Sequence, residues 1–215
     1  MVRKNMRTIA GTPLIAFTIQ AALNSRFVDQ VYLSSDSDEI LAFGKNSGVR
    51  LIHRPSEFAS DTASAIDVVK HFLGEIPSQL VEENPYILYL QPTSPLRSAK
   101  HIDMAMQQMM DQSAHTLVSV VEMAKSPYKS FLIDIDGRLQ SIFDEKMSNA
   151  CRQELPKAYI PNGAIYVFRV SDFLERNGFP SNGGIPFVMS EADSLDIDTE
   201  EDIEYLVRVL RERNG

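Results

Sequence analysis

Polar groups that could bind a ligand are concentrated in residues 91–97. This stretch carries one amide, two hydroxyls and one guanidinium, which together can donate and accept hydrogen bonds. Two prolines restrict its backbone, which suits a loop that must hold a polar side chain in place. The residues alone leave two interpretations open, a ligand-binding loop or a rigid connection with nothing bound. The four groups belong to Gln91, Thr93, Ser94 and Arg97.

A second group of reactive side chains lies near the end of the sequence, where Asp196 and Asp198 flank Ile197. On an extended segment the two carboxylates point to one side, and Leu195 and Ile197 point to the other. Two carboxylates beside a phosphorylated ligand supply the hard oxygen ligands that Mg²⁺ requires. The alternative is the acidic start of a helix, which the helix dipole favours. That alternative explains Glu200 well and Asp196 less well.

The predicted elements place the first loop at the edge of a sheet. Residues 85–90 form an apolar run rich in β formers and bounded by prolines, which predicts a buried strand. Residues 99–112 have helical spacing. Residues 91–97 therefore lie at the carboxyl end of a strand, where open α/β sheets bind ligands.

A third loop, residues 54–64, follows a strand predicted at residues 49–53. Asp61 or Thr62 can cap the helix that comes next. A helix N-terminus exposes backbone N–H groups, which suit phosphate or base edges. A well-capped helix start with nothing bound explains the same residues, and both interpretations stay open here.

Helices and strands alternate along most of the chain, which predicts one α/β domain over residues 1–215 with a doubly wound, mostly parallel sheet. The alternation stops at a predicted β-ribbon around the turn Asp136-Gly137. This ribbon is too extended to bury itself, so we expect residues 126–158 to pack on a second subunit. Further strands are expected at residues 30–33, 116–122 and 164–168, and further helices after residue 12, over residues 38–46, after residue 63 and after residue 199.

Composition argues against several classes of protein. The net charge of −8 and the sequence pI near 5.0 argue against a nucleic-acid-binding protein, which would need a basic face. No apolar run reaches the roughly 18 residues that a membrane-spanning helix needs. The single cysteine, Cys151, excludes an internal disulfide framework and fits a reducing cytoplasm.

Residues 90–97, Leu-Gln-Pro-Thr-Ser-Pro-Leu-Arg, resemble the sugar-site loop of the acylneuraminate cytidylyltransferases, the CMP-sialic acid synthetases. Residues 54–64, 159–166 and 193–200 support the resemblance. It implies a Rossmann-like nucleotidyltransferase fold and Mg²⁺-dependent transfer of a cytidylyl group from CTP to a nine-carbon 2-keto sugar acid, with release of pyrophosphate. It also implies a homodimer in which residues 126–158 form the dimerisation arm.

The resemblance also implies roles for individual residues. Gln91 and Asp198 would be catalytic, and Lys129 and Arg152 would reach the partner's sugar site from the arm. For these two cations the alternative is the common fate of a solvated surface charge. The implied nucleotide-binding residues are Lys4, Asn5, Arg54 and Ala63, the sugar-binding residues are Gln91, Ser94, Lys129 and Arg152, and the Mg²⁺ ligands are Asp196 and Asp198.

The sequence departs from the family pattern at two places. Ile160 stands where family members commonly carry an arginine that would meet the sugar's carboxylate, which leaves the identity of the sugar open. Only Lys4-Asn5 remains of the first segment, a strand and a loop containing Arg, Ser and Lys. We therefore expect a native chain that extends upstream by about 15 residues, and poor catalysis by the 215 residues alone.

Two alternatives to a sialic acid synthetase follow from these departures. One is a sister enzyme that activates a related acid such as legionaminate, because only the sugar pocket would differ. The other belongs to a different class, a non-catalytic dimeric paralogue that binds a sugar acid.

Overall fold

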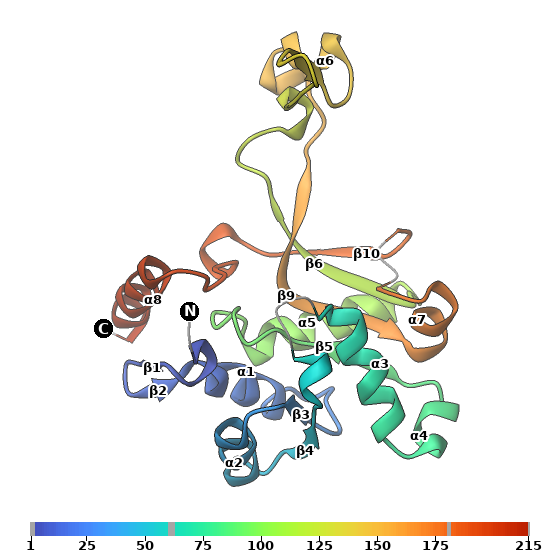
Figure 1. Ribbon diagram of the computed structural model, residues 1–215, viewed down its shortest axis with the longest axis vertical. Coiled ribbons are helices and arrows are strands. Elements are labelled where there is room, and N and C mark those ends of the chain that lie inside the picture. Colours follow the sequence, from blue (N-terminus) through green and yellow to red (C-terminus); the bar gives the residue numbers. More distant parts are fainter. Residues whose placement is uncertain (1–2, 60–62, 180–181, 215) are drawn as a thin grey trace.

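A computed structural model describes residues 3–59, 63–179 and 182–214 (Figure 1). Its helices are α1 (Leu14–Leu23), α2 (Asp38–Asn46), α3 (Ala65–Glu75), α4 (Ser78–Glu82), α5 (Ala99–Asp111), α6 (Glu145–Asn149), α7 (Val170–Arg176) and α8 (Glu200–Asn214). Its strands are β1 (Thr8–Ile9), β2 (Thr12–Pro13), β3 (Tyr32–Ser35), β4 (Arg50–His53), β5 (Tyr86–Tyr89), β6 (Thr116–Glu122), β7 (Phe131–Ile133), β8 (Leu139–Ser141), β9 (Tyr159–Arg169) and β10 (Ile185–Val188). The predicted α/β class is confirmed.

The largest sheet has four strands in the order β10-β6-β9-β5. Strand β10 is parallel to β6, whereas β9 is antiparallel to both β6 and β5. Three of the four strands therefore run in one direction, and β9 runs against them. Strands β3 and β4 form a separate parallel pair, with Leu33 opposite Leu51.

Helices cover both faces of the large sheet, as a doubly wound fold requires. Strand β9 shows this alternation, because Val167 packs with residues of α5 and Phe168 packs with residues of α3 and α7. Both side chains are at most 1% exposed. Helix α8 lies over a third cluster, where its Leu206 packs with Leu96 and Ile197. The residues after β5 and the residues before α8 are thereby brought together.

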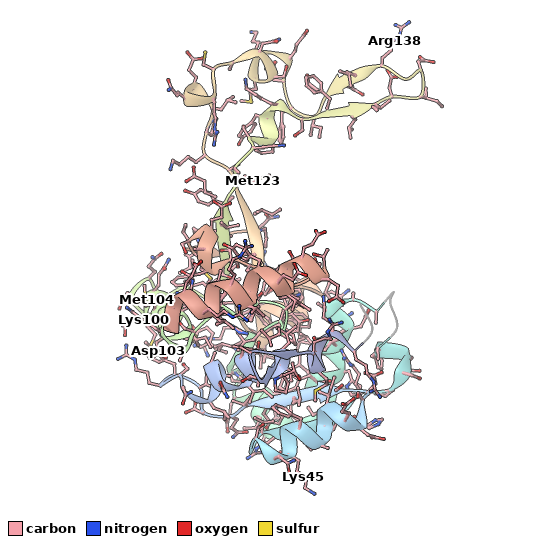
Figure 2. The ribbon with its side chains drawn as sticks, turned by 90° about the vertical axis from the view of Figure 1, so that its left-hand side faces the viewer. Lys45, Lys100, Asp103, Met104, Met123 and Arg138 are labelled. Atoms are coloured by element: carbon pink, nitrogen blue, oxygen red, sulfur yellow. The ribbon has the colours of Figure 1, made fainter. Side chains whose placement is uncertain are left out.

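Residues 126–158 project from the body as an arm (Figure 1). The ends of β6 and β9 pair up to Glu122 and Tyr159 and form its stalk. Figure 2 shows Met123 at the base of the arm and Arg138 at its far end. The expected hairpin is present as β7 and β8, with Gly137 in its turn at a φ of 77°.

Several local details differ from the sequence prediction. The N-cap of α3 is Ser64, whose hydroxyl accepts a hydrogen bond from the Asp67 backbone N–H, and not Asp61 or Thr62. Positions 61 and 62 lie outside the described residues. Helix α7 and strand β10 were not predicted, because α7 has seven residues and β10 contains Pro186. Among the described helices, none is long and apolar enough to cross a membrane.

Candidate active site

The loop of residues 91–97 lies between β5 and α5, as the sequence predicts. Ser98 closes it by capping α5, since its hydroxyl accepts from the His101 backbone N–H at 3.3 Å. The His101 imidazole accepts in turn from the Ser98 backbone N–H. The loop therefore runs between two well-defined elements.

Gln91 is held from two sides. Its backbone carbonyl accepts hydrogen bonds from the Thr18 hydroxyl at 3.4 Å and from Arg97 Nη2 at 3.3 Å. Its side-chain Oε1 lies against Gly163, where any added Cβ would overlap it. Gly163 also has a φ of 74°, so both the space and the backbone favour glycine there.

Two other polar groups of this loop, Ser94 and Arg97, face the interior. The Ser94 side chain is fully buried, and its hydroxyl donates to the Asn162 carbonyl at 3.4 Å. Arg97 is 1% exposed, donates to the Thr18 hydroxyl at 2.5 Å, and has its pKa lowered to about 10 by burial. The sequence offered Arg97 as a ligand group, but the structure uses it to hold the loop against α1. Gln91 and Thr93 are the members of the set that stay half-buried, and the Gln91 side chain lies against Gly163.

The segment that carries the two aspartates is attached directly to this loop. The Ile197 backbone N–H donates to the Thr93 carbonyl at 2.9 Å, and its side chain is fully buried. Asp196 and Asp198 on either side of it are exposed. The predicted alternation is therefore confirmed.

The cap of α8 does not use either aspartate side chain. The Thr199 hydroxyl accepts from the Asp202 backbone N–H at 3.3 Å. The Asp202 carboxylate accepts from the backbone N–H groups of Asp198 and Thr199 at 2.9 and 2.7 Å, which lowers the pKa of Asp202. The carboxylates of Asp196 and Asp198 take no part in the cap, which weighs against the simple helix-start interpretation.

Lys4 lies at the same place, although 194 positions separate it from Asp198. Its Nζ donates to the Ile197 carbonyl at 2.7 Å and to Asp198 Oδ1 at 3.1 Å. Arg7 adds a bidentate ion pair with Glu200, in which Nη1 and Nη2 donate at 2.7 and 2.5 Å. Beside Lys4, Asn5 has a buried side-chain oxygen without a hydrogen-bond partner among the described residues. The two ends of the sequence thus meet at the candidate site.

The donor set fits Mg²⁺ rather than a metal that needs a complete protein cage. Asp196 and Asp198 offer hard oxygen ligands at the surface, and Mg²⁺ commonly takes one or two carboxylates with water and phosphate oxygens completing its shell. In the described part of the chain, no group of three or more His, Cys, Asp or Glu side chains is arranged for a metal. The residues present suit a metal that arrives with a phosphorylated ligand.

Arg54 lies close enough to Tyr89 for its charge to act on the pKa of that residue. It follows β4, and its backbone N–H donates to the Ser35 carbonyl at 2.9 Å. Its buried Nε has no hydrogen-bond partner among the described residues. Ala63 is half-buried and directly precedes the Ser64 cap of α3.

Two tyrosines that the sequence analysis did not select lie between these groups. Tyr89 and Tyr166 are opposite one another on β5 and β9, with ring centroids 6.1 Å apart. Burial raises the pKa of Tyr89, while Gln91 and Arg54 act in the opposite direction. Burial, Tyr89 and Asp196 all raise the pKa of Tyr166. Tyr89 could have been found from its position two residues before Gln91, which places both on one side of an extended chain.

The two predicted arm cations are not near the rest of the site within this chain. Lys129 lies in a 3₁₀ turn, Pro127–Lys129, and Arg152 lies in another, Arg152–Glu154. Both turns belong to the arm, which extends away from the body (Figure 1). Ile160 is 48% exposed in the stalk, opposite Val121. That Lys129 and Arg152 reach a partner's sugar site stays a prediction.

Known proteins resemble this chain in sequence, and others resemble it in fold. A family model described as "Cytidylyltransferase" matches residues 1–176. An N-acylneuraminate cytidylyltransferase of Escherichia coli O18:K1:H7 is 29% identical over 211 residues, which cover 98% of this chain and 49% of that protein. A pseudaminic acid cytidylyltransferase of Campylobacter jejuni is 29% identical over 204 residues, covering 94% of this chain and 87% of the relative.

The chain spans about half the length of the N-acylneuraminate cytidylyltransferase that it matches. A solved CMP:2-keto-3-deoxy-manno-octonic acid synthetase complexed with CTP superposes with a TM-score of 0.70 at 15% identity, covering 99% of this chain and 93% of that one. This likeness supports the nucleotidyltransferase fold. The family model covers most of the 215 residues, so the chain belongs to the cytidylyltransferase family.

Proposed function

We propose that the protein activates a nine-carbon 2-keto sugar acid with CTP. The anomeric hydroxyl oxygen of the sugar forms a bond to the α-phosphorus of CTP, the bond to the β,γ-pyrophosphate breaks, and the hydroxyl proton is released. The products are the CMP-sugar and pyrophosphate. Such phosphoryl-transfer chemistry depends mainly on positioning and charge neutralisation.

One observation carries the proposal. The Ile197 N–H to Thr93 carbonyl bond joins the loop that carries Gln91 to the segment that carries Asp196 and Asp198. A group that can orient a hydroxyl and a pair of carboxylates suited to metal-bound phosphates therefore lie side by side. Lys4 brings a cation to the same place.

The residues take distinct roles in this proposal. The Gln91 amide orients the sugar, while the buried Ser94 and Arg97 hold Gln91 in place rather than touching the substrate. Arg54, with its unpartnered Nε among the described residues, Asn5 and Ala63 bind the nucleoside. Mg²⁺ held by Asp196 and Asp198 would neutralise the triphosphate and the departing pyrophosphate. Lys4 changes partner from Asp198 to a phosphate oxygen when the nucleotide binds.

The sugar itself is proposed only at the level of the nonulosonic acids. Relatives at similar identity are named for N-acylneuraminate and for pseudaminic acid. Ile160 removes one cation that would meet the sugar's carboxylate in the family pattern. A panel of N-acetylneuraminate, legionaminate and pseudaminate separates these substrates.

We also propose a homodimer with shared sites. The arm carries apolar side chains that are exposed in the single chain and that water does not favour. Lys129 and Arg152 lie in the same arm, so a partner's site is where they can meet a sugar carboxylate. The exposed apolar residues are Phe131 at 45%, Leu132 at 58%, Ile133 at 73%, Ile135 at 102%, Leu139 at 69%, Ile142 at 47% and Phe143 at 55%.

The decisive experiment measures pyrophosphate release with CTP, Mg²⁺ and each sugar acid, with UTP and ATP as nucleotide controls. In the native protein we expect turnover with CTP and one of the three acids, and loss of turnover in Gln91→Ala. CTP binding by calorimetry without turnover on any acid would contradict the proposal and favour a non-catalytic binding protein.

A further inference from the structure

Strand β9 contains a bulge beside the candidate site. In its register with β6, Val118 lies opposite Tyr166 and Val120 lies opposite Pro161. The chain therefore advances five residues along β9 while it advances two along β6. Gly163 in this stretch has a φ of 74°. Bulges next to active sites commonly redirect side chains, which makes the residues inside this one worth following.

Asn162 fills the bulge and is 7% exposed. Its amide oxygen accepts from the Ser119 hydroxyl at 2.6 Å and from the Ala164 backbone N–H at 3.3 Å. The Ser119 hydroxyl accepts in turn from the Ile165 backbone N–H at 2.7 Å. One side chain thus replaces the strand pairing that the bulge removes.

Two further contacts of Asn162 reach both halves of the candidate site, and its amide nitrogen also contacts Met189 Sδ at 3.3 Å. Its backbone carbonyl accepts from the Ser94 hydroxyl at 3.4 Å, in the loop that carries Gln91. Its amide nitrogen donates to the Ser194 hydroxyl at 2.9 Å, two residues before Asp196. The Ser194 hydroxyl donates to the Ser190 carbonyl at 2.7 Å, so its position is defined.

We propose that Asn162 is a positioning residue that sets the loop of Gln91 relative to the segment of Asp196 and Asp198. The inference rests on the proposed function, because it assigns sugar and metal sites to these two segments. Asn162 does not touch the substrate. It acts through Ser194 toward the aspartates and, with its neighbour Gly163, through Ser94 and Gln91 toward the sugar.

The first test measures the coupling without chemistry. The Ile197 N–H, which bonds the Thr93 carbonyl, reports whether the two segments stay joined in amide hydrogen exchange. In Ser194→Ala we expect exchange at Ile197 to accelerate about tenfold, the factor expected for one lost hydrogen bond. Ser25→Ala is the matched control, since its buried hydroxyl donates to Asp103 at 2.6 Å in another part of the molecule.

The second test separates the two arms of the coupling. Ser194→Ala should weaken Mn²⁺ binding to the enzyme–CTP complex by about 10- to 100-fold, as measured by electron paramagnetic resonance of free Mn²⁺. It should leave the KM for the sugar acid unchanged. Gly163→Ala should displace Gln91 and lower kcat/KM for the sugar acid by about 10²-fold, with Mn²⁺ binding retained. A purely structural role would lower the Tm of both variants and leave both specific effects absent.

The outcomes are distinguishable. Equal exchange at Ile197 in Ser194→Ala and Ser25→Ala would overturn the positioning role, whatever the Mn²⁺ binding and the kinetic constants show. A second outcome is that exchange accelerates in Ser194→Ala while the wild-type protein binds neither Mn²⁺ nor CTP. That result would support the coupling and contradict the proposed function.

Discussion

Asp198 is an exposed residue with a defined partner. Its ion pair with Lys4 spans 3.1 Å, and the two side chains are 71% and 24% exposed. Exposed pairs of this kind contribute little to stability, because water and salt screen them. The contact can therefore be exchanged for a metal or a phosphate at small cost, which is what a nucleotide site requires.

We predict that Asp198→Asn lowers kcat by about 10²-fold or more, because it removes a formal charge from the proposed metal site while keeping the shape. The measurement is pyrophosphate release over a Mg²⁺ titration. Glu201→Gln is the matched control, since it removes an exposed charge from the first turn of α8. Unchanged turnover of Asp198→Asn at limiting Mg²⁺ would remove Asp198 from the metal site.

At the scale of elements, the start of α8 determines where the aspartates lie. The cap formed by Thr199 and Asp202 holds the backbone of Asp198, and the buried Ile197 anchors the preceding segment. The helix itself is held by Leu206 in the same cluster as Ile197. A change in the cap therefore affects both helix stability and site geometry.

Thr199→Ala should lower the free energy of unfolding by about 1 kcal/mol, the usual effect of losing an N-cap hydroxyl. It should also weaken Mn²⁺ binding, because Asp198 directly precedes the cap. Urea denaturation and Mn²⁺ titration check the two effects. Thr199→Ser keeps the hydroxyl and should behave as the wild type, so equal losses in both variants would contradict the capping role.

The Asp202 carboxylate gives α8 a pH dependence. Its hydrogen bonds from Asp198 and Thr199 lower its pKa below the ordinary value of 3.8. Between the folded and unfolded pKa values the unfolded chain binds more protons, so the stability from this group is present above pH 3.8 and is lost as the pH falls below it. We expect the difference in unfolding free energy between the wild type and Asp202→Asn to shrink as urea titrations move from pH 7 to pH 3. A constant difference would contradict this assignment.

At the scale of the whole molecule, the arm is the part that the chain does not bury by itself. Ile133 and Leu139 are cross-strand partners in the β7–β8 hairpin and are 73% and 69% exposed. Figure 2 shows that the hairpin lies well away from the body. Covering such a surface is the physical reason to expect a second copy of the chain.

We predict that Ile133→Asp converts a dimer to a monomer, because it places a charge in the proposed apolar contact. Size-exclusion chromatography with light scattering measures the mass. Met104→Asp is the control, since Met104 is 50% exposed on α5 in the body (Figure 2). A wild-type protein that is monomeric at micromolar concentration would contradict the arm's role.

Shared sites predict complementation between subunits. Gln91→Ala and Lys129→Ala should each be poorly active alone, and a mixed dimer should contain one site that carries neither change. Recovery of activity on mixing, with subunit exchange shown by mass spectrometry, is the expected result. No recovery after complete exchange would mean that each site is built within one chain.

Elements with a local signal could be predicted from the sequence. Residues 38–46 and 116–122 were predicted as a helix and a strand and are α2 and β6, and Asp136-Gly137 identified the β7–β8 turn. Alternation around Ile197 predicted two aspartates on one exposed side. The motif of residues 90–97 placed Gln91 at the end of a strand. Each of these depends on neighbours within a few positions, and such patterns are readable in one chain.

The contacts between distant segments could not be predicted and are seen in the fold alone. Lys4 reached Asp198, Arg97 turned inward to Thr18, and Asn162 joined Ser94 to Ser194. Strand β10 was missed because its support is parallel pairing with β6, about 70 positions away, and not its own composition. Periodicity shows which side of an element is buried, but not what covers it. The partner is selected when the whole core packs, and that depends on all segments at once.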